Sequence, residues 1–187
     1  EELSRASRTI LAFLPVLAAK IATQLLRRPK PANMMFLGLL VILWVANLVV
    51  HLDWVGIVPG AAPLGLRAGL FALAAFIAVL GGRVTPAFTR NAMLRQGFEA
   101  NLPTSRKLDD RLAIAATIAL PVAVLGGLDA RAAAVLALLA GGAMLLRASA
   151  WRLDFALGQP ILWSLHVSYG LVALGLALCG LAWLGLG

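Results

Sequence analysis

The sequence predicts an all-α integral membrane protein: a single bundle over residues 1–187, with about six transmembrane helices and a short interfacial helix after the third. Composition is the first support, because 61% of the residues are hydrophobic, 13% are charged and the mean hydropathy is +0.93. A soluble domain carries about a quarter charged residues. The second support is a series of apolar runs near the roughly 17–25 residues that a bilayer crossing needs.

These apolar runs differ in quality. The first is the weakest because it holds Pro15 and Lys20. A proline in a membrane helix causes a kink whose freed carbonyl a neighbour satisfies, and a lysine near a helix end can extend to the interface. The predicted spans lie near residues 9–26, 34–52, 64–82, 111–128, 132–146 and 161–186.

Basic residues divide unevenly between the two ends of such a bundle. With six spans, twelve of the 16 Lys and Arg residues fall on one side. The positive-inside rule assigns that side to the cytoplasm. We therefore expect the connection Arg83–Asp110 to be cytoplasmic and both chain ends to be outside. The net charge of +8 indicates topology, and no nucleic-acid partner is expected.

The first residue of the chain and its cysteine count lead to two further expectations. The chain starts at Glu1 without a methionine, so we expect a piece of a longer protein whose remaining spans are partners of this bundle. The single cysteine, Cys179, excludes a disulfide or a multi-cysteine metal site within the chain.

The stretch "GGRVTPAFTRNAM", residues 81–93, is polar although it directly follows an apolar run. We expect Gly81 and Gly82 to end the third span. Thr85 then suits an N-cap, and Pro86 suits the first turn of a short helix at the cytoplasmic interface.

Arginine side chains give this stretch its candidate chemistry. Arg83, Arg90 and the N-terminal amides of the short helix would form an anion-binding corner, with Asn91 also facing a ligand. The alternative is that these arginines contact lipid phosphates and enforce topology. Composition leaves both interpretations open.

The two histidines are the candidates for metal binding, because imidazole is a common ligand of haem iron and copper. His51 falls at the outer end of the second span and His166 near the inner start of the sixth. At 1.5 Å per residue they are separated by roughly 15 Å or more along the membrane normal, so they do not share one metal ion. His166 is the stronger candidate because it is expected at the same membrane level as Arg83 and Arg90, and because Tyr169 and other polar or aromatic residues lie within a helical turn of it.

Four blocks occur in the order "ANLVVHL", "GGRVTPAFTRNAM", "RLAIAAT" and "QPILWSLHVSYGLVALGLAL". In this order they resemble the NnrS family of multi-span bacterial inner-membrane proteins, which are associated with denitrification and nitric oxide. The resemblance implies haem and copper as cofactors, protection against nitrosative stress, nitric oxide as a small ligand, and the bacterial inner membrane as location. An early family motif of the "WHAHE" kind is absent from this chain.

The resemblance also implies roles for individual residues. Arg83 and Arg90 suit the haem propionates, Phe88 suits packing against the ring, and His166 suits the iron. Asn91 and Tyr169 complete the predicted cofactor-binding set.

His51, beside Asp53, becomes a candidate for a separate copper site, oriented through its second ring nitrogen. A structural hydrogen bond explains the same pair nearly as well, so both interpretations stay open.

Two classes of function remain. No nucleophile, base and orienting group converge in the sequence, so any redox chemistry would belong to the cofactor, and whether the protein is an enzyme stays open. The alternative is a transporter or channel-like bundle for a small anion at the Arg83 and Arg90 corner. Transporters typically show inverted repeats and paired broken helices, and the sequence shows neither.

Overall fold

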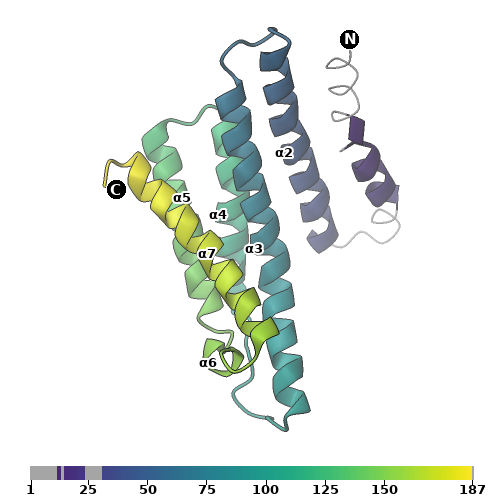
Figure 1. Cartoon of the computed structure of the whole chain (residues 1–187), viewed down its shortest axis with the longest axis vertical. Coiled ribbons are helices and arrows are strands. Elements are labelled where there is room, and N and C mark those ends of the chain that lie inside the picture. Colours follow the sequence, from purple (N-terminus) through teal and green to yellow (C-terminus); the bar gives the residue numbers. More distant parts are fainter. Residues whose placement is uncertain (1–11, 14, 24–30, 187) are drawn as a thin grey trace. The chain divides into compact units, whose positions relative to one another are not determined.

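The computed structural model describes residues 12–13, 15–23 and 31–186, and this part of the chain is helical with no β-strand. The prediction of an all-α protein is therefore confirmed. Its helices include α2 (Pro31–Trp54), α3 (Ala62–Arg95), α4 (Lys107–Leu125), α5 (Ala130–Ala148), α6 (Leu153–Ala156) and α7 (Pro160–Trp183) (Figure 1).

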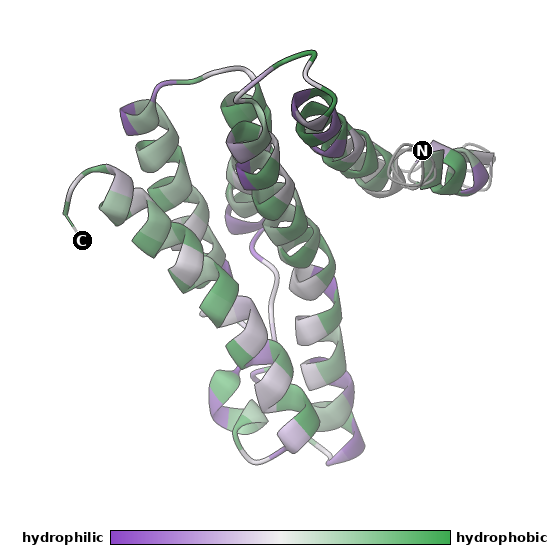
Figure 2. Cartoon of the chain, turned by 45° about the horizontal axis from the view of Figure 1, so that its top comes forward, coloured by the Kyte–Doolittle hydropathy of each residue, from purple (hydrophilic) through white to green (hydrophobic). Residues whose placement is uncertain are grey.

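Four of the described helices are long and apolar enough to cross a membrane: α2 from Met34, α3, α5 and α7. Figure 2 shows hydrophobic residues along these helices and hydrophilic residues mainly at helix ends and in connections. The prediction of six spans is not confirmed. The predicted span 111–128 corresponds to α4, whose first turns carry charged residues, and the predicted span 9–26 lies partly outside the described residues.

The predicted break after the third span is wrong. Helix α3 runs without interruption through Gly81, Gly82 and Pro86 to Arg95, a length of 34 residues. At 1.5 Å per residue this is about 50 Å, against about 30 Å for the hydrocarbon core of a bilayer. No separate interfacial helix begins at Pro86, so the helix N-terminal amides expected at the anion-binding corner are absent from it.

Packing explains why the helix continues. Small or hydroxyl-bearing residues of α3 stay buried at helical spacing through the polar stretch: Ala78, Gly82, Thr85 and Thr89. Pro86 has no N–H, so the carbonyl of Gly82 loses its partner within the helix. Arg147 of α5 supplies the replacement, because its Nη2 donates to Gly82 O at 3.1 Å. A residue 65 positions later in the chain thus satisfies the carbonyl that the proline frees.

The chain packs into two compact units. One comprises the described residues up to Leu73 together with Pro121–Gly127, and the other comprises Ala74–Leu120 and the described residues from Leu128.

Glycines allow α5 and α7 to approach closely in the second unit. A Cβ placed on Gly141 would lie 2.5 Å from the Ala173 carbonyl oxygen, and one on Gly180 would lie 2.7 Å from the Ala134 carbonyl oxygen. Backbone cannot yield as a flexible side chain can, so these positions exclude larger residues. Small residues of this kind are typical of helix contacts in membranes.

Gly141→Ala is therefore expected to lower the thermal stability of the protein in detergent, although alanine favours helix over glycine by about 1 kcal/mol. Gly142→Ala is the matched control, because a Cβ at Gly142 meets nothing within 4 Å. The measurement is the midpoint of thermal unfolding of both variants beside wild type. Equal midpoints for the two variants would contradict the close contact at Gly141.

Candidate functional site

The second unit contains a polar cleft of about 680 Å³, within the range of small-molecule sites. Three arginines line it, together with one carboxylate and several hydrogen-bonding groups. The polar lining residues are Arg83, Arg90 and Asn91 of α3, Thr104 and Ser105 of the following connection, Asp110 of α4 and Arg147 of α5. One carboxylate against three guanidinium groups leaves the cleft positively charged.

The connection that carries Thr104 and Ser105 is held by the segment after α5. The backbone N–H of Thr104 donates to Ala150 O at 3.1 Å, and Arg152 Nη1 donates to Asn101 O. Arg152 also binds the Asp154 carboxylate and thereby holds the pKa of Asp154 below its usual range. These contacts place the hydroxyl groups at the edge of the cleft.

Arg147 is the most buried of the cleft arginines, with 4% of its side chain exposed. Its Nε donates to Asp110 Oδ1 at 2.5 Å and its Nη1 to Ala78 O at 2.8 Å, beside the bond to Gly82. The Asp110 carboxylate also accepts from the Ser105 hydroxyl. Arg147 therefore connects α3, α4 and α5 at the wall of the cleft.

The two glycines of "GGRVT" are packing positions. A Cβ on Gly82 would lie 1.9 Å from Arg147 Nη1, and a Cβ on Gly81 would lie 3.0 Å from the ring of Tyr169. Glycine at position 82 is what lets the guanidinium reach the helix backbone. Sequence reasoning did not identify Arg147 or Asp110 as site residues. An arginine near the end of an apolar run was the available signal.

The structure brings three of the predicted site residues together. Arg83, Arg90 and Asn91 all line the cleft. Arg83 and Arg90 are seven positions apart on one helix, so they share a face about 10 Å apart along its axis. Phe88 is 50% exposed and is outside the cleft lining.

His166 and Tyr169 are not among the residues that line the cleft, although the Tyr169 ring packs against Gly81, next to the lining residue Gly82. His166 is buried, with Nδ1 2.9 Å from Leu162 O and Nε2 3.2 Å from Trp151 O. Tyr169 packs edge-on against Trp151, with ring centroids 4.6 Å apart. Neither residue lines the cleft, so the structure does not bring His166 to Arg83 and Arg90.

His51, in the first unit, is oriented differently from the prediction. Its Nδ1 lies 3.0 Å from Asn47 O, and the Asp53 carboxylate instead accepts from the backbone N–H groups of Gly60 and Ala62, at 3.0 and 2.6 Å. Asp53 thus holds the α2–α3 connection and the start of α3. The expectation that Asp53 orients His51 is wrong, because backbone donors take both of its oxygens.

Long apolar helices, a buried arginine and a basic cleft define a helical, multi-span membrane protein with a polar site in its second unit. The sequence model of the NnrS protein family matches residues 6–187, essentially the whole chain. The chain belongs to the NnrS family, and the resemblance seen in the sequence is confirmed. No curated protein and no solved structure matches it.

Proposed function

We propose that this chain is part of a haem- and copper-containing protein of the bacterial inner membrane that handles nitric oxide in denitrification or nitrosative stress. The observation that carries the proposal is the family match over residues 6–187, which the apolar helices support. The stretch Arg83–Asp110, which comprises the end of α3 and the connection to α4, is proposed to face the cytoplasm, because basic residues concentrate there.

The cleft suits the anionic part of a ligand. Arg83 and Arg90 can each offer a planar pair of donors to a carboxylate, and Asn91 adds an amide donor. The residues that line the cleft include no histidine, cysteine, methionine or tyrosine. The cleft therefore fits haem propionates or another oxyanion, and an iron ligand has to come from outside it.

Bound haem would supply the binding of nitric oxide and any electron transfer, and the side chains of this chain would bind and orient it. Arg147 and Asp110 form an ion pair at the cleft wall, and Arg83 and Arg90 line the same cleft. Packing of Phe88 against a haem ring remains a prediction that the cleft does not support. No catalytic set of side chains is proposed.

A transporter or channel-like bundle for a small anion is the second candidate, and the polar cleft favours it. Against it, α3 and α7 run unbroken among the described residues, whereas transporters commonly bind substrate at paired broken helices.

Purified full-length protein is expected to show a Soret band and to contain iron and copper. Absorption spectroscopy and metal analysis by mass spectrometry provide the measurement. A cooperative thermal unfolding transition would show that the purified protein is folded. If such protein has no Soret band and no metal after expression with haem precursor and copper, the proposal is contradicted and the transporter is favoured.

A further inference from the structure

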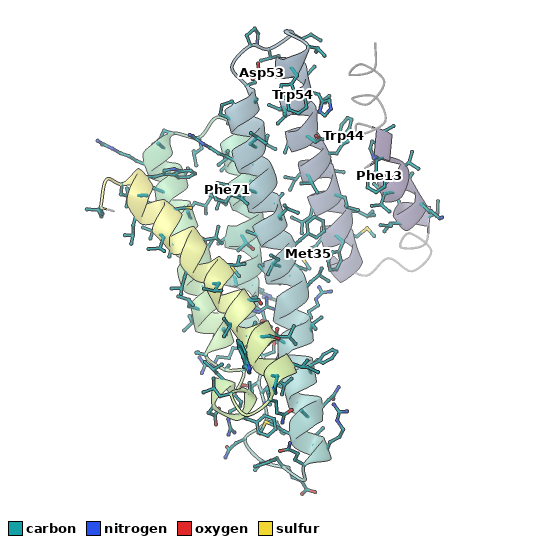
Figure 3. All side chains as sticks on the ribbon, viewed as in Figure 1. Phe13, Met35, Trp44, Asp53, Trp54 and Phe71 are labelled. Atoms are coloured by element: carbon teal, nitrogen blue, oxygen red, sulfur yellow. The ribbon has the colours of Figure 1, made fainter. Side chains whose placement is uncertain are left out.

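The apolar turn, residues 54–61, joins α2 to α3 in the first unit and exposes four large hydrophobic side chains. The exposed fractions are 69% for Trp54, 61% for Val55, 68% for Ile57 and 44% for Val58. Figure 3 shows Asp53 and Trp54 at the end of α2 that leads into this turn. No residue from 54 to 66 is charged, whereas the α4–α5 connection carries the exposed Asp129 and Arg131. Contiguous exposed apolar side chains mark a contact with a membrane or with another protein.

The charge nearest to the turn is satisfied within it. Both oxygens of Asp53 accept backbone N–H groups, from Gly60 at 3.0 Å and from Ala62 at 2.6 Å. Ala62 begins α3, and the N-terminal end of a helix favours a negative charge. The Asp53 carboxylate is therefore engaged by the backbone, and the outer surface of the turn is apolar.

The backbone of the turn satisfies its own donors. Pro59 has no N–H, and every other residue from 55 to 62 donates its backbone N–H at 2.6–3.3 Å. The acceptors are the carbonyl oxygens of His51, Leu52, Asp53 and Val58 and the carboxylate of Asp53. Gly56 and Gly60, with φ of +76° and +82°, permit so tight a turn. Water satisfies such N–H groups outside a membrane, whereas a backbone in contact with lipid has to satisfy them internally.

Two side chains set the depth of the turn. The span of α2 from Met34 to Trp54 has 21 residues, about 32 Å at 1.5 Å per residue, against about 30 Å for the hydrocarbon core. Trp54 thus falls at a membrane boundary, where tryptophan is enriched. Arg67 is exposed and lies about 8 Å along α3 from Ala62. An arginine at that depth reaches the phosphate groups with its long side chain, so the turn lies at headgroup level and not in the core.

We propose that the apolar turn inserts into the headgroup layer of the bilayer, with Trp54, Ile57 and Val58 against the headgroup ends of the acyl chains. Arg67 binds the lipid phosphates beside it. The turn continues the lipid-facing surface of the two helices, on which Val41, Leu66 and Leu70 are also exposed. Membrane lipid is therefore the partner of the turn, and the turn anchors the first unit at a fixed depth. No cofactor is needed for this role.

The test places a nitroxide label on full-length protein in vesicles of phosphatidylethanolamine and phosphatidylglycerol. Native cysteines, Cys179 included, are first replaced by serine. The label is attached in Val58→Cys or, as the matched control, in Leu128→Cys, because both positions are 44% exposed and Leu128 precedes the exposed Asp129. Electron paramagnetic resonance measures collisions of the label with oxygen, which concentrates in lipid, and with a nickel chelate, which stays in water. The ratio of oxygen to nickel collisions is expected to be higher at Val58 than at Leu128.

Two further variants, each combined with Val58→Cys, test the physical reasons separately. Asp53→Ala frees the N–H groups of Gly60 and Ala62, so the turn should move toward water and the ratio should fall. Ile57→Asp leaves the backbone intact but adds a charge at an exposed position, and the ratio should fall again. Ile57→Leu is the control and should keep the wild-type ratio. Thermal unfolding checks that each variant is folded.

Three results would overturn the proposal. Equal ratios at Val58 and Leu128 would show that the turn projects into water. Few collisions of the Val58 label with either reagent would show that protein, from another part of the full-length chain or from a second copy, covers the turn. An unchanged ratio in Ile57→Asp would show that acyl chains do not contact this surface. This last variant decides the question even if Asp53→Ala does not fold.

Discussion

Arg147→Met is expected to lower the free energy of unfolding by about 3–5 kcal/mol, the usual cost of removing one partner from a buried ion pair. The substitution leaves Asp110 without its cation and the Gly82 carbonyl without a donor, next to a proline that cannot supply one. Unfolding in detergent titrated with sodium dodecyl sulfate measures the loss. Arg111→Met, at an exposed position of α4 outside the cleft lining, is the control.

Two further variants locate the source of this loss. Combining Arg147→Met with Asp110→Asn should recover part of the stability, because the unpaired carboxylate is then neutral. Gly82→Ala keeps both charges but places a Cβ where the guanidinium lies, so it should reproduce part of the loss. A cost for Arg147→Met no larger than that of the Arg111 control would refute the structural role of Arg147.

The double variant Arg83→Lys, Arg90→Lys is expected to weaken binding of an anionic group in the cleft by roughly 1.5–3 kcal/mol, on the order of tenfold to a hundredfold. Lysine keeps each positive charge but loses the planar pair of donors. Membrane insertion should be unchanged, because it depends on the number of basic residues near the span ends. Haem content and reduction potential are the measurements if the group is a propionate.

Arg111→Lys again serves as the control, since this arginine is exposed and does not line the cleft. If Arg83 and Arg90 contact lipid phosphates instead, lysine serves equally well. If the double variant has the haem content, spectrum and reduction potential of the wild type, the anion-binding role of Arg83 and Arg90 is refuted, and their role is in membrane topology.

Local residue patterns were sufficient for the class of the protein. Apolar runs predicted helices where α2, α5 and α7 lie, with ends displaced by a few residues. The motif order predicted the family that the match over residues 6–187 shows. Three residues of the candidate site, Arg83, Arg90 and Asn91, were predicted from one stretch of the sequence. In the structure they lie on α3 and line one cleft.

Tertiary structure decided what the polar stretch does, because the partners of its backbone lie far along the chain. Two glycines and a proline resemble a helix end when only neighbours are considered, yet Arg147 fills the space that Gly82 leaves and binds the carbonyl that Pro86 frees. The surroundings of the two histidines were also decided by tertiary structure. The sequence shows where the imidazoles occur along the chain. Only the fold shows that both ring nitrogens of His166 contact carbonyl oxygens, and that one ring nitrogen of His51 is buried without a hydrogen-bond partner among the described residues.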